Sequence, residues 1–359
     1  MLSNSLPLRF CKAEPSHYNQ LVPLVRQVLI SGNSLHAHSY DFQKWHWKYF
    51  DLKHAKPLIY LCLEGDEIIG YYHCPVYEGI IETKPVLIAM VQDVGITEKA
   101  RGKGVFAQLA KFANHDLAKN QIDFVITYPN DKSLPTFIKY NQYQLIATLD
   151  ALILPVKSSL IIAQKLPRFL AEIFGASIDT LFSTTHKTWQ PQQIGIVPEF
   201  NTEMIQIFEL HYNQFQNYIK RSMHYLKWRF EAKPNHTHFI INASFDNKIH
   251  TVLVFGIEDL LGVKAAVLLD YATTNPNAMA NAMLQLAKNS GKYFNHDVAM
   301  FYTSSLPHNS KVLQKCGFIK IPKKLNPRPL NLMAKNITTT NDAYLAGKWQ
   351  VTLSEWDVL

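Results

Sequence analysis

Cysteine is scarce in this sequence, and its spacing matches neither a metal site nor a disulfide framework. The chain of 359 residues has four cysteines, none of them in a CxxC pair: Cys11, Cys62, Cys74 and Cys316. Fifteen histidines are present, but no HExxH motif occurs. These absences argue against a zinc site and against a disulfide-stabilised secreted domain. We therefore expect no metal and a reducing compartment.

Long apolar segments are lacking as well. The opening stretch MLSNSLPLRFCK contains no apolar run of the length found in secretory signals. The most apolar region, residues 158–182, is interrupted by Lys165, Pro167, Arg168 and Glu172, so it does not match a membrane-spanning helix. We expect a cytoplasmic protein without a transmembrane segment, in which residues 158–182 pack between domains. A helix lying on a membrane surface is the alternative.

Basic residues are dispersed, although the net charge is +8. Because no run of Lys and Arg occurs, we expect no nucleic-acid partner. Apolar content, in contrast, is ample, at 47% hydrophobic and 12% aromatic residues. A chain of this length and composition predicts a folded protein with about two domains.

A glycine-containing turn stands out between an apolar run and an amphipathic segment. Residues 86–96, VLIAMVQDVGI, predict a buried strand, and apolar residues recur at helical spacing from Val105 onward. The turn between them carries Arg101, Gly102, Lys103 and Gly104. Glycines allow backbone amides to approach a ligand, and a helix N-terminus offers unpaired N–H groups. The pattern predicts a pyrophosphate-binding turn, although its spacing matches neither GxxxxGK[ST] nor GxGxxG.

The stretch ARGKGVF resembles the acyl-CoA-binding motif R/Q-x-x-G-x-G/A of the GCN5-related N-acetyltransferase (GNAT) superfamily. Arg101 and Gly104 match the motif, whereas Phe106 departs from its final small residue. Residues 122–143 resemble the next motif of the superfamily, with Asn130, Ser133, Phe137 and Tyr143 in place and Gln142 where glycine is usual. Residues 58–75 predict two strands around Gly65, which fits the central meander of the fold.

The resemblance implies acetyl-CoA as co-substrate and acyl transfer to an amine. It also implies that a backbone amide near the end of the predicted strand polarises the thioester carbonyl. The cofactor-binding residues expected from it are Val94, Gly95, Ile96, Arg101, Gly102, Lys103, Gly104, Val105, Phe106, Asn130 and Ser133. Asn130 has a second interpretation, since the same residue type commonly caps a helix.

Two side chains are candidates for the catalytic acid and base. Asp93, at the end of the predicted strand, would deprotonate or attract a cationic amine, or it is simply a structural partner. Tyr140, in the short helix after Asn130, would protonate the thiolate, or it is a packed or surface aromatic. Ile88 stands where some relatives carry a glutamate base. Tyr128 and His73 are further residues expected near the cleft.

The chain also shows an internal repeat. KWHWKYF (44–50) is echoed by YLKWRFE (225–231), and Asp93 aligns with Asp270, each followed by LAK sixteen residues later. These matches predict a tandem duplication. Where the first copy has RGKG, the second has Ala-Met-Ala-Asn at 278–281, so we expect the second copy to have lost cofactor binding.

We therefore expect an α/β (α+β) protein of two tandem GNAT folds, each a twisted, mixed, mostly antiparallel sheet flanked by helices. The predicted parts are an N-terminal domain with the acetyl-CoA site (1–155), a connecting segment (156–198), a degenerate domain (199–335) and a tail packing on it (336–359). Residues 349–358 resemble the ending of tandem GNAT-like proteins near bacterial surface-polysaccharide genes, with Glu355 and Asp357 at its acidic positions.

The expected function is a bacterial, cytoplasmic N-acetyltransferase that acts on a small-molecule or sugar amine, such as an amino sugar or a surface-polysaccharide precursor. A FemABX-like aminoacyl ligase is one alternative, and a non-catalytic protein that binds acyl-CoA or an acceptor is another. The sequence carries no signal for the identity of the acceptor or for the oligomeric state.

Overall fold

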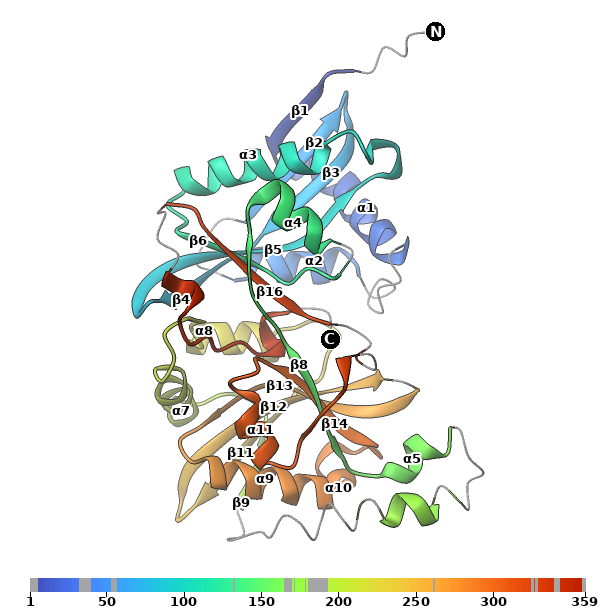
Figure 1. Ribbon diagram of the computed structural model, residues 1–359, viewed down its shortest axis with the longest axis vertical. Coiled ribbons are helices and arrows are strands. Elements are labelled where there is room, and N and C mark those ends of the chain that lie inside the picture. Colours follow the sequence, from blue (N-terminus) through green and yellow to red (C-terminus); the bar gives the residue numbers. More distant parts are fainter. Residues whose placement is uncertain are drawn as a thin grey trace.

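The protein consists of two β-sheets, each flanked by helices and stacked along the long axis of the molecule (Figure 1). The computed structural model describes residues 6–31, 40–52, 57–131, 133–164, 170, 172–177, 179, 193–260, 262–323, 326, 329–338 and 343–356. The expected class, a mixed α/β fold with mixed and mostly antiparallel sheets, is confirmed.

The N-terminal sheet has nine strands. Its main path is β1 (Leu8–Lys12), β2 (Leu58–Glu64), β3 (Glu67–Cys74), β5 (Lys84–Ile96), β6 (Phe124–Thr127), β16 (Asn331–Asn336) and β7 (Gln144–Thr148). Two further strands extend it, because β4 (Val76–Ile81) pairs with β5 and β10 (Tyr218–Ile219) pairs with β4. The pair β5–β6 is parallel, and the other pairs are antiparallel.

The C-terminal sheet has seven strands in a matching order. They are β15 (Ile319–Lys320), β8 (Asp150–Pro155), β14 (Met300–Ser305), β13 (Val263–Thr273), β12 (Lys248–Leu260), β11 (Phe239–Phe245) and β9 (Gln193–Val197). Here the pair β13–β14 is parallel. Each sheet therefore has one parallel pair near its middle.

The two sheets exchange a strand. β8 follows β7 in the chain but crosses into the C-terminal sheet, where it pairs with β14 and β15. β16 makes the reverse crossing and lies between β6 and β7 of the N-terminal sheet (Figure 1). Residues 150–155, which we assigned to the N-terminal domain, and residues 331–335, which we assigned to the second domain, thus pair in the opposite sheets.

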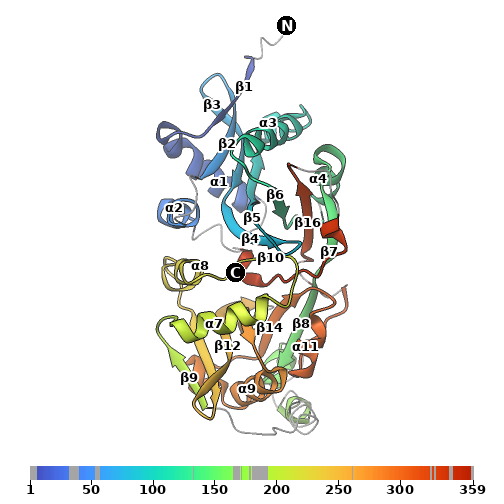
Figure 2. The same cartoon turned by 90° about the vertical axis from the view of Figure 1, so that its left-hand side faces the viewer.

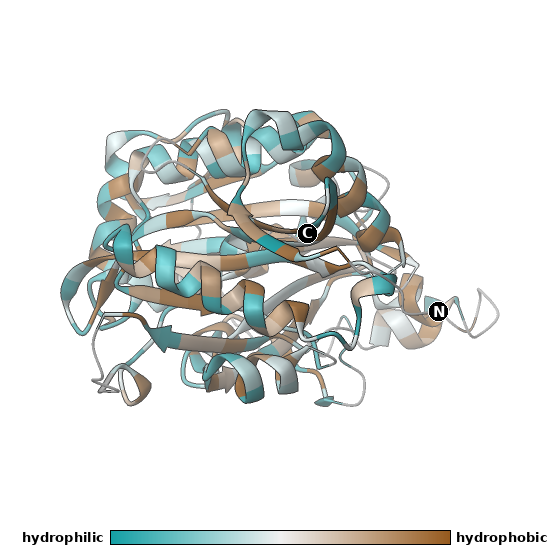
Figure 3. Ribbon diagram, turned by 90° about the horizontal axis from the view of Figure 1, so that it is seen from above, coloured by the Kyte–Doolittle hydropathy of each residue, from teal (hydrophilic) through white to brown (hydrophobic). Residues whose placement is uncertain are grey.

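Helices cover both faces of each sheet. α1 (Tyr18–Ser31) and α2 (Phe42–Phe50) lie on one face of the N-terminal sheet, and α3 (Val105–Lys119) and α4 (Leu134–Asn141) lie on the other. The faces follow from the alternation of strand residues, since Ile59 packs with the α1 side whereas Tyr60 packs with α3. In the helices, hydrophilic and hydrophobic residues alternate at short intervals (Figure 3), as expected for helices with one buried side.

The C-terminal sheet is covered in the same way. α7 (Thr202–Tyr212) and α8 (Met223–Leu226) lie on the side toward the N-terminal sheet (Figure 2). The opposite face packs against α9 (Pro276–Lys288), α10 (Ser290–Phe294) and α11 (Ser310–Lys315). α5 (Ser158–Ile162) follows β8 at the outer end of this sheet.

A continuous core joins the two sheets. Trp47 of α2 and Trp228, just after α8, stack with ring centroids 5.1 Å apart. Each indole N–H donates to the backbone carbonyl of the other tryptophan, at 2.9 Å in both cases. The two sheets therefore share one hydrophobic core rather than meeting through a polar surface.

The expectation that residues 158–182 pack between domains is wrong for the part of that segment that the structure describes. Ile173 and Phe174 are 61% and 52% exposed, and α5 lies far from the N-terminal sheet (Figure 1). Other parts of the 156–198 connecting segment lie outside the described residues, as do Asp357 and residues 339–342 of the tail. Among the described helices, none has the length and apolar content needed to cross a membrane.

Candidate active site

The glycine turn follows a point at which two parallel strands separate. β5 and β6 pair from Ile88–Phe124 to Val91–Thr127, where β6 ends. β5 continues to Ile96 beside β3. Within the described residues, the edge of residues 92–96 that would face β6 has no strand partner, so its backbone groups are left for a bound molecule.

The space between the separated strands is a pocket of about 790 Å³. It brings together most of the predicted cofactor-binding residues: Val94, Gly95, Ile96, Arg101, Phe106, Asn130 and Ser133. Gly102, Lys103, Gly104 and Val105 do not line it but lie beside it, in the turn that leads into α3. Residues that the sequence did not indicate complete the walls, among them Val28, Leu29, Lys48 and Trp356.

The turn has the geometry that an anion requires. Gly102 and Gly104 have φ of +77° and +72°, a left-handed conformation that side-chain-bearing residues rarely adopt. A Cβ would meet nothing within 4 Å at Gly102 and only the Gln108 amide, at 3.8 Å, at Gly104, so backbone conformation and not crowding requires glycine here. Residues 101–104 are all exposed. No side-chain cap is present among the described residues at the start of α3, so its first N–H groups face outward next to Arg101 and Lys103.

Asn130 and Ser133 close the pocket on the side of α4. The Asn130 Oδ1 accepts hydrogen bonds from the Ser133 amide at 2.9 Å and from the Ser133 hydroxyl at 3.0 Å. Asn130 therefore stabilises the turn before α4 while lining the pocket, and the N-cap residue of α4 is Ser133, so the capping interpretation of Asn130 is wrong. Phe106 packs edge-on against Phe137 with centroids 5.4 Å apart, which provides an apolar wall.

Asp93 lines the pocket, but its carboxylate is already engaged. Its Oδ2 accepts from the Tyr49 hydroxyl at 2.6 Å, the Lys48 Nζ at 3.0 Å and the Tyr40 hydroxyl at 3.1 Å. Burial raises the pKa of Asp93, but the Lys48 charge and these hydrogen bonds outweigh it and hold the pKa below its ordinary value. An ionised carboxylate of this kind attracts a cation but is a weak proton acceptor.

His73 is a neutral structural residue beneath Asp93. Burial lowers its pKa to about 4. Its Nε2 lies 3.1 Å from the Trp45 indole N–H and accepts from it, which leaves the proton on Nδ1 to donate to the Asp93 carbonyl at 2.9 Å. This contact lies where the β3–β5 register shifts and where Asp93 has φ of +40°. His73 therefore holds the irregular backbone at the base of the pocket.

Tyr140 does not reach the pocket. Its side chain is 54% exposed, and its ring lies beside the Lys139 ammonium, 5.2 Å from the ring centroid. Tyr128, at the end of β6, is the tyrosine that lines the pocket. Its hydroxyl donates to Glu355 Oε2 at 2.7 Å. The sequence offers no spacing signal for this pair, because the two residues lie at opposite ends of the chain.

The glycine turn and the separated strands coincide with a family match. Residues 12–145 match the family model described as an acetyltransferase (GNAT) domain. Residues 12–145 form a GNAT acetyltransferase domain. The chain is therefore an acyltransferase, and acetyl-CoA is the co-substrate that fits the uncapped, glycine-bearing turn of this domain.

Solved structures share the fold over nearly the whole chain. A GCN5-related N-acetyltransferase from Anabaena variabilis is 11% identical and aligns over 92% of this chain and 73% of its own, with a TM-score of 0.65. A probable N-acyltransferase from Enterococcus faecalis is 12% identical over 92% and 72%, with a TM-score of 0.63. N-myristoyltransferase from Saccharomyces cerevisiae with bound myristoyl-CoA is 13% identical over 92% and 84%, with a TM-score of 0.57. No curated protein matches the sequence.

Asp270 of the C-terminal sheet has surroundings like those of Asp93 in the GNAT domain. The Arg221 Nε donates to Asp270 Oδ2 at 2.6 Å, and the Tyr212 hydroxyl donates to Oδ1 at 2.9 Å. Asp270 and the Arg221 side chain are no more than 1% exposed. Each aspartate thus pairs with one cation and with tyrosine.

In the C-terminal sheet, the chain itself packs beside the end of the parallel pair β13–β14. β13 and β14 pair only from Ala265–Met300 to Val267–Tyr302. The short helix η7 (Leu353–Glu355) packs against both strands beyond that point, and the Ser354 hydroxyl donates to Asp270 Oδ2 at 2.8 Å. Trp356, which follows η7, lines the GNAT pocket.

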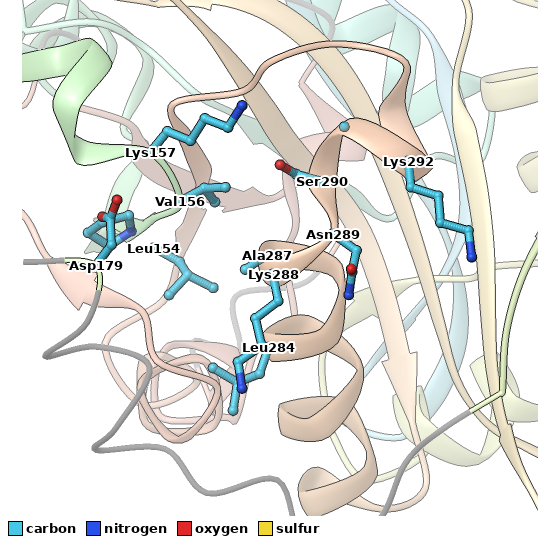
Figure 4. Close-up of a pocket in the computed structure, with 12 residues that line it drawn as sticks. Leu154, Val156, Lys157, Asp179, Leu284, Ala287, Lys288, Asn289, Ser290 and Lys292 are labelled. Carbon is cyan, nitrogen blue, oxygen red and sulfur yellow. The ribbon is translucent and has the colours of Figure 1, made fainter. Parts of the chain in front are cut away.

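A separate pocket of about 550 Å³ lies at the C-terminal sheet (Figure 4). The end of β8 and the residues joining α9 and α10 form its walls, with Lys157 and Lys288 on opposite sides and Ser290 between them. Lys157 is paired with Asp297. The pocket contains no counterpart of the glycine turn, so we assign the acyl-CoA site to the GNAT pocket alone.

Proposed function

We propose that this protein is an N-acetyltransferase that transfers the acetyl group of acetyl-CoA to an amine in the GNAT pocket. The observation that carries this proposal is the combination of separated parallel strands with an uncapped helix N-terminus at Gly104. The strands leave a slot lined by backbone groups, and the turn next to it offers N–H groups and two cations. A nucleotide-bearing thioester needs both features, one for its extended arm and one for its pyrophosphate.

The residues divide into three roles. Arg101, Gly102, Lys103, Gly104 and Val105 hold the pyrophosphate at the start of α3. Phe106, Asn130 and Ser133 contact the arm. The backbone of Val94, Gly95 and Ile96 offers an amide to the thioester oxygen, whose negative charge grows as the amine attacks.

The chemistry needs an amine that has lost its proton and a thiolate that regains one. Asp93 serves to attract the cationic amine, since its lowered pKa and three donors make it a poor base. We assign no proton transfer to Tyr140, because its ring lies on the exposed side of α4.

We further propose that the C-terminal sheet is a second, degenerate copy of the GNAT fold. The common strand order, the Asp93 and Asp270 clusters and the stacked pair Trp47–Trp228 support a duplication. Loss of cofactor binding is supported by the start of α9, where Asn275 Oδ1 caps the helix by accepting from the Asn277 and Ala278 amides. η7 in addition occupies the space between the separated strands.

The acceptor we propose is a small-molecule or sugar amine, such as an amino sugar or a surface-polysaccharide precursor in a bacterial cytoplasm. The Asp93 carboxylate in the pocket supports an amine acceptor. A FemABX-like ligase and a non-catalytic acyl-CoA-binding protein are the competing functions. The intact anion-binding turn disfavours the ligase.

Thermal unfolding with acetyl-CoA, CoA and ATP tests the binding site. A ligand at a hundredfold excess over its Kd adds about 2.7 kcal/mol to the free energy of unfolding. With about 0.75 kcal/mol/K of unfolding entropy for 359 residues, Tm rises by about 3–4 °C. We expect this shift with both CoA species and none with ATP.

The substitution Gly104→Asp places a negative charge at the turn, and we expect it to abolish the shift. Gly262→Asp is the control, since Gly262 is exposed, has φ of +77° and lies in the turn before β13 of the other sheet. Its shift should equal that of the wild type. An intact acetyl-CoA response in Gly104→Asp would contradict the assignment of the turn.

Release of CoA thiol from acetyl-CoA with a panel of primary amines, including amino sugars, separates an enzyme from a sensor. The proposal requires amine-dependent thiol release by the wild type. Acetyl-CoA binding with no thiol release for any amine would favour the non-catalytic alternative.

A further inference from the structure

A buried carboxylate is connected to the GNAT pocket through Tyr128. Glu355, in the C-terminal segment, is 3% exposed, and its Oε2 accepts from the Tyr128 hydroxyl at 2.7 Å. Tyr128 itself lines the pocket together with Asp93 and the backbone of the end of β5. The pocket therefore has an indirect route to a second carboxylate besides Asp93.

Glu355 is held in place by the C-terminal half of the molecule. Its Oε1 accepts from the Arg221 Nη2 at 2.7 Å, and the Arg221 side chain is 1% exposed. The Arg229 Nε donates to the Ser354 carbonyl at 2.6 Å, which fixes the adjoining backbone. Both oxygens of Glu355 thus have a defined partner, and the one bonded to Tyr128 faces the pocket side.

The electrostatic surroundings suit Glu355 to accept a proton. Burial raises the pKa of Glu355, and Arg221 opposes this effect only in part. Burial and the neighbouring Glu355 charge also raise the pKa of Tyr128 well above its ordinary value, so the phenol stays protonated. The charged and titratable groups that face this pair are Arg221, Arg229, Tyr212, Tyr225 and Asp270.

Asp93 is less suited than Glu355 to accept a proton. Its pKa is lowered, and a single oxygen receives three donors, one of them the Lys48 ammonium. Both carboxylates accept from tyrosine hydroxyls, but the partner of Glu355, Tyr128, lines the pocket, whereas Tyr40 and Tyr49 do not. A phenol between a substrate and a buried carboxylate is a suitable intermediate for general base catalysis.

We propose that Tyr128 and Glu355 form a proton relay that deprotonates the acceptor amine. This inference rests on the proposed acetyl transfer. Tyr128 is the catalytic residue, which receives a proton from the ammonium group as its own hydroxyl proton passes to Glu355 Oε2. Glu355 acts through Tyr128 as a positioning residue and as the proton acceptor.

The steps balance without a further reactant. The neutral amine attacks the thioester carbon, the C–N bond forms, and the C–S bond breaks. The proton left on nitrogen passes to the departing thiolate, which gives CoA thiol and an amide. The proton on Glu355 returns through Tyr128 to solvent after the product leaves, so one proton is released for each amine that entered as ammonium.

The test compares nucleophiles that differ in their need for a base. Rates of CoA release are measured for an accepted primary amine, which is mostly protonated at neutral pH, and for hydroxylamine, which is mostly neutral, with enzyme-free rates subtracted. We expect Glu355→Gln to lower the rate with the primary amine by about 10²–10⁴-fold and the rate with hydroxylamine by less than about threefold. The slope of the primary-amine rate with pH should also steepen, since only amine deprotonated in solution would react.

Asp270→Asn is the matched control, because it converts the other buried carboxylate on Arg221 to an amide without touching Tyr128. It should leave the nucleophile ratio at the wild-type value. Tyr128→Phe removes only the phenolic hydroxyl and serves where Glu355→Gln folds poorly. It should reproduce the selective loss with the primary amine.

Two outcomes would overturn the relay. One is an equal loss of activity with both nucleophiles, and the other is the same behaviour in Glu355→Gln and Asp270→Asn. Either would assign Glu355 to holding the C-terminal segment. If the wild type itself releases no CoA with any amine or with hydroxylamine, the proposed acetyl transfer fails first, and the relay fails with it.

Discussion

The substitution Asp93→Asn separates the charge of this pocket residue from its shape. Asparagine has nearly the same size and tolerates the φ of +40° at this position, so the backbone gains no strain. The Tyr49 and Tyr40 hydroxyls still have an oxygen to which they can donate. The loss is confined to the counter-charge of Lys48, whose Nζ lies 3.0 Å from Asp93 Oδ2 and whose side chain is 5% exposed.

The expected loss of stability is large because the ion pair is buried. Removing one partner of a buried ion pair costs about 3–5 kcal/mol, whereas an exposed pair is worth about 0–1 kcal/mol. With an unfolding entropy of about 0.75 kcal/mol/K for this chain length, Tm falls by about 4–7 °C. The double variant Lys48→Met/Asp93→Asn removes both charges, and we expect it to recover at least about 2 kcal/mol.

Urea unfolding of the wild type, both single variants and the double variant at pH 7 gives the four free energies of the cycle. A buried ion pair between Lys48 and Asp93 predicts a coupling energy of at least about 2 kcal/mol. It would be refuted if Asp93→Asn stayed within about 1 kcal/mol of the wild type, or if the two single effects simply added.

Two further predictions concern residues away from the pocket. Burial lowers the pKa of His211 to about 4, whereas the pKa in the unfolded chain is about 6.5. Between these two pH values the unfolded state binds one more proton than the folded state. The free energy of unfolding therefore falls as the pH decreases from 6.5 to 4. His211→Phe should therefore shrink the difference in unfolding free energy between pH 7 and pH 4.5 by about 2.5 kcal/mol, and an unchanged difference in urea titrations would contradict a neutral, buried His211. Trp228→Ala removes a ring stacked on Trp47 and one of two reciprocal hydrogen bonds, so the free energy of unfolding should drop by about 3–5 kcal/mol; a drop below about 1 kcal/mol would show that the shared core contributes little.

The elements of the fold were predictable where the signal is local. The apolar run 86–96 became β5, and the helical spacing after Gly104 became α3, whose buried stripe includes Leu109, Ala113 and Leu117. No local sequence pattern indicates that β8 and β16 exchange between the two sheets. β8 reads DALILP, an apolar run that can pair in either sheet, and its neighbour β14 begins at Met300, far along the chain.

The residues of the site, too, were predictable where they are adjacent in the sequence. The glycine turn is defined by adjacent residues, and the structure places it beside the pocket. Tyr140 illustrates the limit, since successive helix residues differ by about 100° in direction. Phe137 and Asn141 form the buried side of α4, and Tyr140, one position before Asn141, faces solvent. Glu355 contacts Tyr128 only because the chain returns to the pocket from the opposite sheet.

Because the chain returns to the GNAT pocket, the C-terminal half contributes to that pocket whether or not it binds a ligand of its own. From β16 in the N-terminal sheet, the chain packs Trp349 against Phe124 and then passes along the C-terminal sheet before Trp356 reaches the GNAT pocket. Arg221 belongs to the C-terminal half, yet it holds the carboxylate to which Tyr128 of the pocket is bonded. A second half that had lost its anion-binding turn would therefore still be required, because the N-terminal sheet draws two of its strands, β10 and β16, and part of the pocket wall from the chain beyond residue 198.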